Sequence, residues 1–298
     1  MASLPPMLSR ADVTQGSGNV SRVAQPASID TLRARLRELD RVLVAFSGGA
    51  DSAFLAWMAH DTLGPNRASA VTAVSPSLAP DEAADCAALA AEWGLRWQAV
   101  TTDELDRPGY VANDTDRCAH CKAELMEVIG PIGTAESAVV VLGTNLDDLG
   151  DHRPGQAVAA GGGAAFPLVD AGFTKAAVRE ASRTLGLRTW DKPAAACLAS
   201  RVPYGTPVTL GTLDRVARAE AAVRALGFRQ LRVRHYGDVA RLEVEIEDLA
   251  GVIERRQAVI DAVKAAGYAR VTLDLEGFRS GNLNPNPTEL GSQGRARR

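Results

Sequence analysis

The 298-residue chain lacks several features that would point to particular classes of protein. No apolar run exceeds the length of a strand, so no membrane-spanning helix is expected. The net charge of −3 provides no general basic field, which speaks against nucleic acid as a partner. No repeat of solenoid or propeller period is present. Apolar residues make up 46% and charged residues 23%, as in ordinary globular proteins.

Cysteine is also scarce, with four residues in the whole chain. Residues 1–27 lack the apolar core of a secretory signal and are expected to form a disordered leader. The sequence therefore indicates a cytoplasmic protein. In that compartment its cysteines are expected to be thiols, catalytic groups or metal ligands rather than disulfides.

Residues 28–193 alternate buried strand patterns with amphipathic helix patterns. This alternation predicts an α/β domain with a mostly parallel sheet and helices on both faces. The expected strands are 41–46, 70–74, 96–100 and 138–142. The expected helices are one directly after Gly49, then 81–93, 118–129 and 175–185, the last with Thr174 as its N-cap.

The pattern changes after Pro193. Residues 194–210 are expected to be an active-site linker, and residues 211–283 a small α+β domain for substrate binding or oligomerisation. Its expected elements are a helix (212–226), two strands (230–235 and 240–246), a long helix (249–266) and a strand (269–275). In the second strand polar residues alternate with apolar ones, so one face should meet solvent. Residues 284–298 are expected to be a disordered tail.

The string Ser47-Gly48-Gly49-Ala50-Asp51-Ser52 lies where a buried strand passes into a helix. Glycines there let backbone N–H groups approach an anion, and the helix N-terminus adds its positive dipole end. An ordinary strand–helix turn is the alternative, because Gly and Ser are common in turns. The complete string in this context favours a pyrophosphate-binding loop. It lacks the Gly-Lys-Ser/Thr ending of kinase-type loops, so no clamp for a γ-phosphate is expected.

A second ATP-site candidate, residues 142–155, begins at the carboxyl edge of a strand, where α/β sheets bind ligands. It carries Asp147, Asp148 and Asp151. Carboxylate oxygens suit Mg²⁺, so these three are candidate magnesium ligands. A polar loop capped by Asp and Asn is the alternative.

Cys118 and Cys121 are three residues apart at a helix start, hence on one face. Cys197 is distant in sequence, and Cys86, in an Ala-rich helix, is expected to be a buried structural thiol. The pair alone is compatible with zinc, redox chemistry, an iron–sulfur cluster or no function. Zinc would need a fourth ligand, and His120 is awkwardly placed for it. Three thiolates fit a 4Fe–4S cluster with one iron left open.

Several strings together resemble one family. They are 47–52, Arg117–Lys122, 143–155, Lys192–Gly205, Leu231–His235 and Asp274–Asn284, and the string around Cys197 is the most specific. Over roughly residues 30–284 the chain resembles the LarE-type ATP-dependent sulfur transferases of the PP-loop (N-type ATP pyrophosphatase) superfamily.

The resemblance implies a PP-loop fold, an ATP- and magnesium-dependent reaction that forms AMP and pyrophosphate, and a homo-oligomer. The implied substrate is a pyridinium dicarboxylate mononucleotide, whose carboxylates become thiocarboxylates for the nickel-pincer cofactor of lactate racemase. The expected ATP contacts are Ala45, Phe46, Ser47, Gly48, Gly49, Asp51, Ser52, Val74, Gly143, Thr144 and Asp147.

Two sulfur sources are compatible with the family. Cys197 can give up its own sulfur and become dehydroalanine. Alternatively, Cys118, Cys121 and Cys197 hold a 4Fe–4S cluster that carries an extra sulfide, so that sulfide or another sulfur donor is consumed. The pair Cys118 and Cys121 favours the cluster, because a sacrificial enzyme does not need it.

Arg201, Arg232 and Arg234 are candidates for binding the substrate phosphate, since guanidinium matches phosphate bidentately. A solvated charge on a strand edge is the alternative for Arg232. Glu220 and Glu243 are candidates for a catalytic base or a metal ligand, and a surface role competes for Glu243.

Three other functions remain open at this point. A tRNA-thiolating PP-loop enzyme should carry an RNA-binding domain or a basic surface, and the charge offers no support. An amide-forming ligase of the GMP- or NAD-synthetase type would not need Cys197. A non-enzymatic iron–sulfur or nucleotide-sensing adaptor would use the loop without turnover.

Overall fold

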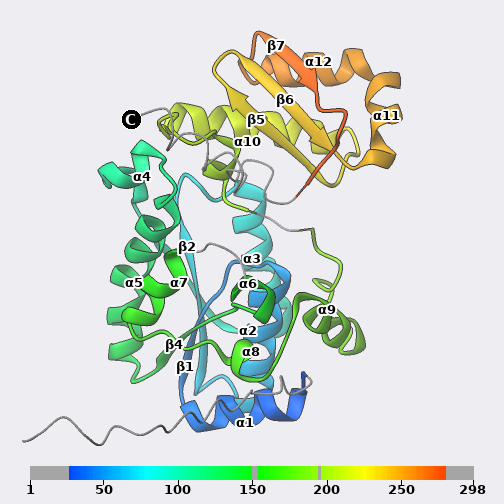
Figure 1. Ribbon diagram of the computed structural model, residues 1–298. Coiled ribbons are helices and arrows are strands. Elements are labelled where there is room, and N and C mark those ends of the chain that lie inside the picture. Colours follow the sequence, from blue (N-terminus) through cyan, green and yellow to red (C-terminus); the bar gives the residue numbers. More distant parts are fainter. Residues whose placement is uncertain (1–26, 150–153, 194–195, 280–298) are drawn as a thin grey trace, which may run out of the picture.

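The computed structural model describes residues 27–149, 154–193 and 196–279. Expectations for residues 1–26, Asp151 and residues 280–298 lie outside this range. Figure 1 shows two bodies, a larger one around a four-stranded sheet and a smaller one around a three-stranded sheet. The predicted fold class, a PP-loop type α/β domain with a small α+β domain after it, is confirmed.

The larger sheet is parallel throughout, in the order β3-β2-β1-β4. Its strands are β1 (Val42–Ala45), β2 (Ala68–Val74), β3 (Arg96–Thr101) and β4 (Val139–Leu142). Val42 and Val44 belong to the core on one face of the sheet, and Leu43 to the core on the other. Successive side chains of a strand point to opposite faces, so a strand covered on both sides must be apolar throughout, as β1 is.

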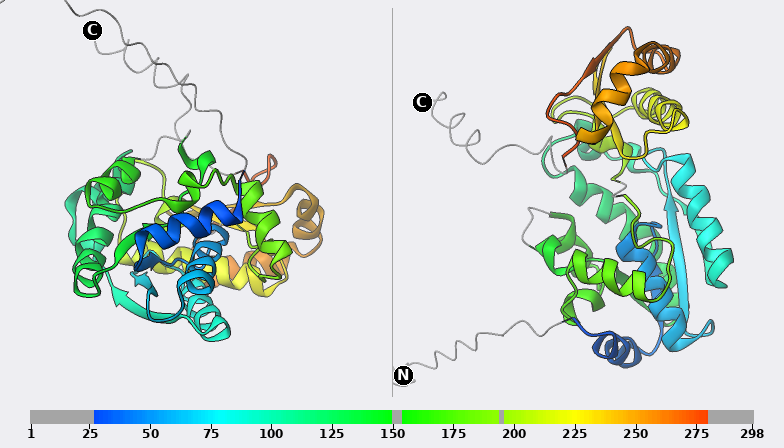
Figure 2. Two further views of the ribbon diagram at one scale, coloured as in Figure 1. Left: turned by 90° about the horizontal axis from the view of Figure 1, so that it is seen from below. Right: turned by 90° about the vertical axis from the view of Figure 1, so that its right-hand side faces the viewer.

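Helices cover both faces (Figures 1 and 2). One layer consists of α1 (Ile29–Leu39), α2 (Ala50–Leu63), α3 (Pro80–Trp93), α8 (Pro167–Asp170) and α9 (Lys175–Thr184). The opposite layer is built on α5 (Arg117–Ala135) and α7 (Pro154–Gly161). Thr174 caps α9 as predicted, since its side chain accepts a hydrogen bond from the Ala177 amide.

Short elements complete the larger body: η1 (Glu104–Asp106), α4 (Pro108–Ala112) and α6 (Leu146–Leu149). The chain then passes through η2 (Leu198–Arg201) into the smaller body. There the Leu198 amide donates to the Ser77 carbonyl at 2.8 Å, so the segment after Pro193 packs on the loop that follows β2.

The smaller body contains α10 (Leu210–Ala225), β5 (Leu231–Tyr236), β6 (Val239–Val244), η3 (Ile246–Asp248), α11 (Leu249–Glu254), α12 (Arg256–Ala265) and β7 (Arg270–Leu273). Its sheet has the order β5-β6-β7, antiparallel between β5 and β6 and parallel between β6 and β7. Its apolar residues form a cluster of their own around Phe228 and Tyr268.

Two details of this body differ from expectation. Glu243, placed by alternation on a solvent-exposed face of β6, is 0% exposed, whereas Ile246, expected inside, is 65% exposed and lies in η3. The long helix predicted for 249–266 is interrupted at Arg255. The Arg255 guanidinium stacks 4.1 Å from the Phe228 ring centroid and donates to the Leu226 carbonyl, and this tertiary contact overrides helix propensity.

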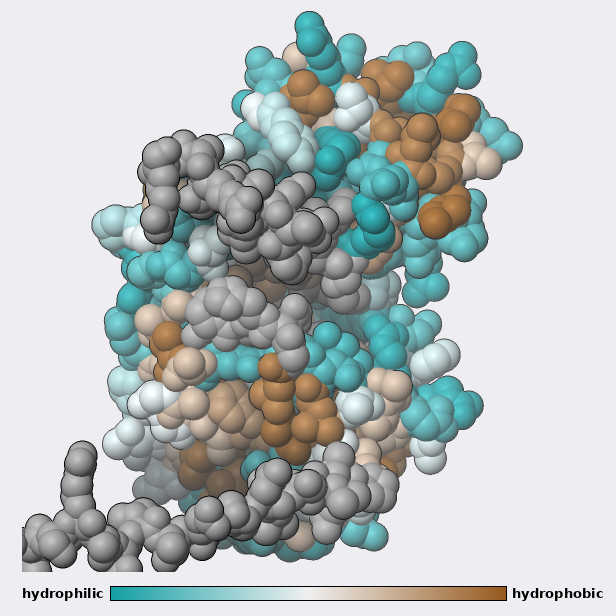
Figure 3. All heavy atoms as spheres, viewed as in Figure 1, coloured by the Kyte–Doolittle hydropathy of each residue, from teal (hydrophilic) through white to brown (hydrophobic). Residues whose placement is uncertain are grey.

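The surface in Figure 3 carries apolar atoms over the smaller body near α11 and again on the larger body. On the smaller body the exposed apolar side chains include Ile246, Ile253 and Leu275. No helix within the described ranges is long and apolar enough to cross a membrane.

Candidate active site

The connections from β1 and β4 diverge at the carboxyl edge of the larger sheet. The chain leaves β1 toward β2 on one side, while β4 adds to the other side of β1. Such a switch point is where open α/β sheets bind ligands. The loop 46–52 and the loop starting at Gly143 flank it.

The phosphate loop is tied to itself by its two serines. The Ser47 amide donates to Ser52 Oγ at 3.2 Å, the two hydroxyls are 3.0 Å apart, and Ser52 Oγ donates to the Gly49 carbonyl at 3.2 Å. Gly49 is the N-cap residue of α2, and no side chain caps this helix. The first N–H groups of α2 are therefore directed at the place where a phosphate would bind.

Gly48 rests against α3. Its φ is +69°, and a Cβ there would lie 2.8 Å from Cys86 Sγ and 3.6 Å from Lys192 Nζ. Cys86 is fully buried, and burial raises the pKa of its thiol, which agrees with the expected structural role. Lys192 Nζ forms ion pairs with Glu82 at 2.7 Å and Asp85 at 2.6 Å. These contacts fix Lys192 against α3.

The loop after β4 packs closely on α2, because a Cβ on Gly143 would lie 2.7 Å from the Ser52 amide nitrogen. Asn145 is buried, and its side-chain oxygen accepts from the Asp147 and Asp148 amides. Asp51 is held near it, and burial followed by the charge of Asp148 raises the pKa of Asp51 to about 6. The charges of Asp51 and Asp148 therefore interact beside the phosphate loop.

The magnesium candidates occupy different positions from those that spacing alone suggested. Asp147 accepts from the Lys175 amide at 2.7 Å and so caps α9, whereas Asp148 is 3.1 Å from Lys175 Nζ. No group of three His, Cys, Asp or Glu side chains arranged for one metal ion occurs in the described ranges.

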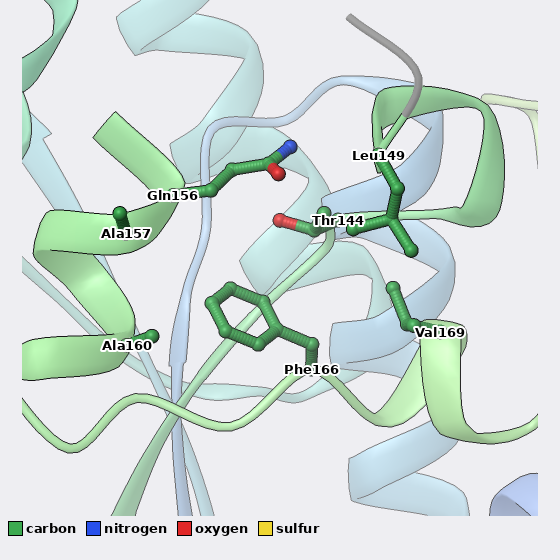
Figure 4. A pocket seen from close by; sticks show the side chains of 7 residues that line it. All are labelled: Thr144, Leu149, Gln156, Ala157, Ala160, Phe166 and Val169. Atoms are coloured by element: carbon green, nitrogen blue, oxygen red, sulfur yellow. The ribbon is translucent and has the colours of Figure 1, made fainter. Parts of the chain in front are cut away.

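The other expected ATP contacts lie along the same edge. Ala45 ends β1 and Phe46 follows it, and the Phe46 amide donates to the Val71 carbonyl of β2, the strand that Val74 ends. Thr144 lines an apolar pocket of about 250 Å³ together with Phe166 and Val169 (Figure 4). Gln156 supplies a side-chain amide at the wall of this pocket.

The structure brings the distant Cys197 to the Cys118–Cys121 pair. Cys121 and Cys197 pack against one cluster of buried side chains that includes Tyr110 and Leu198. Burial, and after it the charge of Cys197, raises the pKa of Cys121 to about 12. Cys118 lies next to them at the start of α5 and is exposed.

Three soft thiolates are suitable donors for a 4Fe–4S cluster, and Cys121 and Cys197 share one partly buried environment. The thiolates of such a cluster bind different irons, so they need not converge on one metal position. The donor set therefore fits the group.

Two buried ion pairs connect this sulfur site to the smaller body. Arg201 binds Glu220 through two hydrogen bonds of 2.8 and 2.9 Å, and both side chains are almost entirely buried. Arg201 Nη1 also donates to the carbonyls of Ala196 and Cys197 at 2.6 and 3.0 Å. One guanidinium therefore holds the backbone of Cys197 and a glutamate of α10 together.

Arg234 repeats the arrangement, donating twice to Glu243 and, at 2.9 Å, to the Ser200 carbonyl. Arg232 stacks on Phe278 at 4.9 Å, and burial together with the charge of Arg201 lowers its pKa to about 10. The alternatives of a solvated Arg232 and a surface Glu243 are wrong, because both are buried. In this geometry Glu220 and Glu243 anchor guanidinium groups, and the pKa of Glu220 is lowered by Arg201 despite its burial, which does not suit a base.

Comparison with known proteins identifies the family. The NAD synthase family model matches residues 27–119, the part of the chain that contains the phosphate loop. The pyridinium-3,5-bisthiocarboxylic acid mononucleotide synthase of Lactiplantibacillus plantarum is 36% identical over 260 residues, covering 87% of this chain and 94% of that protein. The chain belongs to the LarE family of ATP-dependent sulfur transferases.

Two further relatives of this LarE family protein are uncharacterized proteins. One, from Synechocystis, is 43% identical over 261 residues and covers 87% of this chain and 97% of its own length. The other, from Methanocaldococcus jannaschii, is 25% identical over 245 residues and covers 80% and 91%. The similarity therefore includes the segment around Cys197 and most of the smaller body.

Sequence reasoning missed two charged residues at this LarE family site. Lys192 was noted only as part of a string, although its place directly before the Cys197 segment could have drawn attention to it. Arg117, directly before Cys118, is 5% exposed and donates to the Asn113 side chain and, at 3.0 Å, to the Ala199 carbonyl. Nothing in its spacing distinguishes it from a surface arginine.

Proposed function

We propose that this chain uses ATP to adenylate the carboxylates of a pyridinium dicarboxylate mononucleotide and converts them to thiocarboxylates for the nickel-pincer cofactor of lactate racemase. The observation that carries the proposal is the contact made by Arg201. It holds the backbone of Cys197 and is part of a group of three buried arginines, Arg201, Arg232 and Arg234. This contact supports a site in which the sulfur and the charge that binds phosphate lie side by side.

In the first half of the reaction the ATP phosphates lie on the loop from Ser47 to Ser52, at the positive end of the α2 dipole. The carboxylates of Asp51 and Asp148 would hold Mg²⁺, which would offset the negative charge of the phosphates. A substrate carboxylate oxygen attacks the α-phosphorus, and the bond from that phosphorus to the bridging oxygen breaks. The products are an acyl-adenylate and pyrophosphate.

The substrate phosphate binds to Arg201, Arg232 and Arg234. Arg201, Arg232 and Arg234 are buried together, and a group of guanidinium side chains suits a dianionic phosphate. Glu220 and Glu243 fix the planes of Arg201 and Arg234 through paired hydrogen bonds. Because these side chains are held before substrate arrives, little conformational entropy is lost on binding.

The thiolates of Cys118, Cys121 and Cys197 would hold a 4Fe–4S cluster. When bound, it would supply an iron without a protein ligand, where an exchangeable sulfide can sit. The alternative needs no cluster. The Cys197 thiolate attacks the acyl carbon and AMP leaves, after which loss of the Cα proton and cleavage of the Cβ–S bond leave dehydroalanine and a thiocarboxylate. The presence of Cys118 and Cys121 beside Cys197 supports the first source.

A mononucleotide substrate is favoured over tRNA by two observations. The net charge is −3, and the relative with 36% identity is named for a mononucleotide product. The proposal also includes self-association of the chain in the cytoplasm, which the exposed apolar side chains of the smaller body support.

The test is anaerobic purification with iron and sulfide analysis, followed by turnover with ATP, the pyridinium substrate and sulfide. We expect about four irons per chain, as in a 4Fe–4S site, pyrophosphate release that requires the substrate, and more than one thiocarboxylate per chain. Replacing Cys118, Cys121 or Cys197 by Ala should remove the iron, and Cys86→Ala should not. A single turnover in which only Cys197 matters, with the chain losing the mass of one hydrogen sulfide, would establish the sacrificial route instead.

A further inference from the structure

A polar cavity of about 410 Å³ lies between the two bodies. The larger body contributes Arg179 of α9 and the turn residue Asp191 to its wall. The smaller body contributes Arg229, Glu245 and Phe278. This volume is within the usual range of small-molecule sites, so the cavity can hold a planar ring with polar substituents.

Arg179 is fixed in this wall by neutral partners. Its Nη1 donates to the Trp190 carbonyl at 3.1 Å, and its Nη2 donates to the Lys192 carbonyl at 2.9 Å. Within the described ranges no carboxylate forms an ion pair with Arg179. The two bonds set the direction of the guanidinium, which has further N–H groups to offer. An anionic ligand would therefore meet a cation that is already oriented.

The rest of the wall carries both signs of charge and an aromatic face. Arg229 is a second cation, and Asp191 and Glu245 are carboxylates. Charges of both signs suit a ligand that itself carries both. The Phe278 ring suits a flat ring, and a cationic ring best of all, because the face of an aromatic ring is negative. A pyridinium ring with carboxylate substituents combines these properties.

The cavity borders both halves of the candidate active site. Phe278 belongs to its wall and also to the arginine group, since the Arg232 guanidinium carbon lies 4.9 Å from the centroid of the Phe278 ring. On the other side, Arg179 lies one helical turn after Lys175, whose Nζ is 3.1 Å from Asp148. A ligand in the cavity would therefore lie between the arginines and the ATP side.

We propose that this cavity binds the pyridinium ring of the substrate, with one ring carboxylate on Arg179 and the other on Arg229. The ring stacks on Phe278, and Asp191 and Glu245 offset the positive charge of its nitrogen. The identity of the nucleotide rests on the proposed function. The inference adds the residues that select an acid over an amide.

The experiment uses the full chain and two probes that differ in one group. Nicotinic acid mononucleotide has a ring carboxylate, and nicotinamide mononucleotide has a carboxamide in its place. Calorimetric titration without ATP gives a Kd for each. We expect wild type to bind the acid about five- to twentyfold more tightly, the effect of hydrogen bonds to a charged group in a partly exposed site. Arg179→Gln should remove most of this preference by weakening the acid alone.

Arg179→Lys keeps the charge without the guanidinium fork and should keep part of the preference. The matched control is Arg183→Gln on the same helix. Arg183 is already paired with Glu180 at 2.8 Å, so its replacement should leave both Kd values unchanged. Ribose 5-phosphate lacks the ring and should bind Arg179→Gln as it binds wild type, which also shows that the variant is folded.

Wild type that binds the acid and the amide equally, or binds neither, would overturn the inference. An equal loss for both probes in Arg179→Gln would do the same, because it would mean that Arg179 only supports the backbone at Lys192. Arg229→Gln provides a second variant, since Arg229 is exposed and its loss should not disturb the fold. It should lower the preference about two- to threefold through its charge.

The inference and the proposed function fail in different ways. A protein that shows the preference for the acid but forms no thiocarboxylate would count against the proposed function alone. A protein that forms thiocarboxylate without any such preference would count against the inference alone.

Discussion

The ionised form of the Asp51 carboxyl destabilises the free protein, and a bound cation would stabilise it. Burial, with Asp148 as the second cause, raises its pKa from 3.8 to about 6. The folded protein therefore holds this proton more tightly than the unfolded chain does. The resulting stability is fully present below pH 3.8 and is lost as the pH rises through about 6.

Asp51→Asn removes this titration, so the variant should be more stable than wild type at pH 8, by about 1–3 kcal/mol for a shift of this size. The gain should shrink toward pH 4.5. Urea unfolding at the two pH values measures it. The control, Asp238→Asn, changes a carboxylate that is 86% exposed and should show no such dependence. Asp51→Asn should also lose magnesium-dependent ATP turnover. An equal gain in the free energy of unfolding at both pH values would contradict the explanation.

At the scale of elements, the phosphate loop depends on its contact with α3. Gly48 needs a positive φ and has Cys86 Sγ where a Cβ would go, while a Cβ on Gly49 would meet only Ser47 Oγ at 3.7 Å. The two neighbouring glycines thus serve different purposes. Gly48 allows the loop to fold against α3, and Gly49 keeps the anion side clear.

Gly48→Ala should lower the free energy of unfolding by about 1–3 kcal/mol, the usual cost of a left-handed conformation in a residue with Cβ. Gly49→Ala should fold normally and bind ATP less well. Adding Cys86→Ala to Gly48→Ala should recover part of the lost stability, because it removes the clash and leaves the backbone strain. Thermal unfolding and ATP titration distinguish the cases, and equal stability of the two glycine variants would be the contrary result.

The sequence was sufficient for the order of the main elements because each has a local signal. The apolar run of β1, the cap at Thr174 and the glycine after α9 are examples. It failed where a distant partner decides the outcome. Arg255 breaks a helix in order to reach Phe228, and polar Glu243 is inside because Arg234 and Arg241 neutralise it.

The site was predictable to a similar degree. Family resemblance located the arginines and cysteines, and the structure adds which of them are in contact. The ion pair between Arg201 and Glu220 joins η2 to α10. Because the partners lie in different elements, the residue pattern of neither element predicts the pair. Arg117 and Lys192 were noted only as members of strings, because the contacts that distinguish them arise from the tertiary fold.

At the scale of the whole molecule, each body has an apolar cluster of its own, and the two meet through a third apolar cluster and through polar contacts around the site. The smaller body also exposes Ile246, Ile253 and Leu275, which are 65%, 57% and 78% exposed. Apolar side chains gathered on one surface commonly mark contacts between chains.

Ile253→Asp should therefore reduce the proposed oligomer to smaller species in analytical ultracentrifugation, leaving the far-UV spectrum unchanged. Leu210→Asp is the matched control, since Leu210 is 62% exposed at the start of α10, away from α11, and should not alter the mass. An unchanged mass for Ile253→Asp, or a wild-type monomer, would rule out this surface as the contact.

Arg201 donates hydrogen bonds to both Glu220 and the Cys197 carbonyl, and these bonds make the position of Cys197 depend on the smaller body. Because each body has an apolar cluster of its own, either one could be expected to fold when it is replaced by the equivalent part of a relative. The sulfur-bearing backbone, however, takes its position from a glutamate in the other body. A chimera of two relatives would keep both folds, but it would misplace the Cys197 sulfur unless Arg201 and Glu220 came from the same parent.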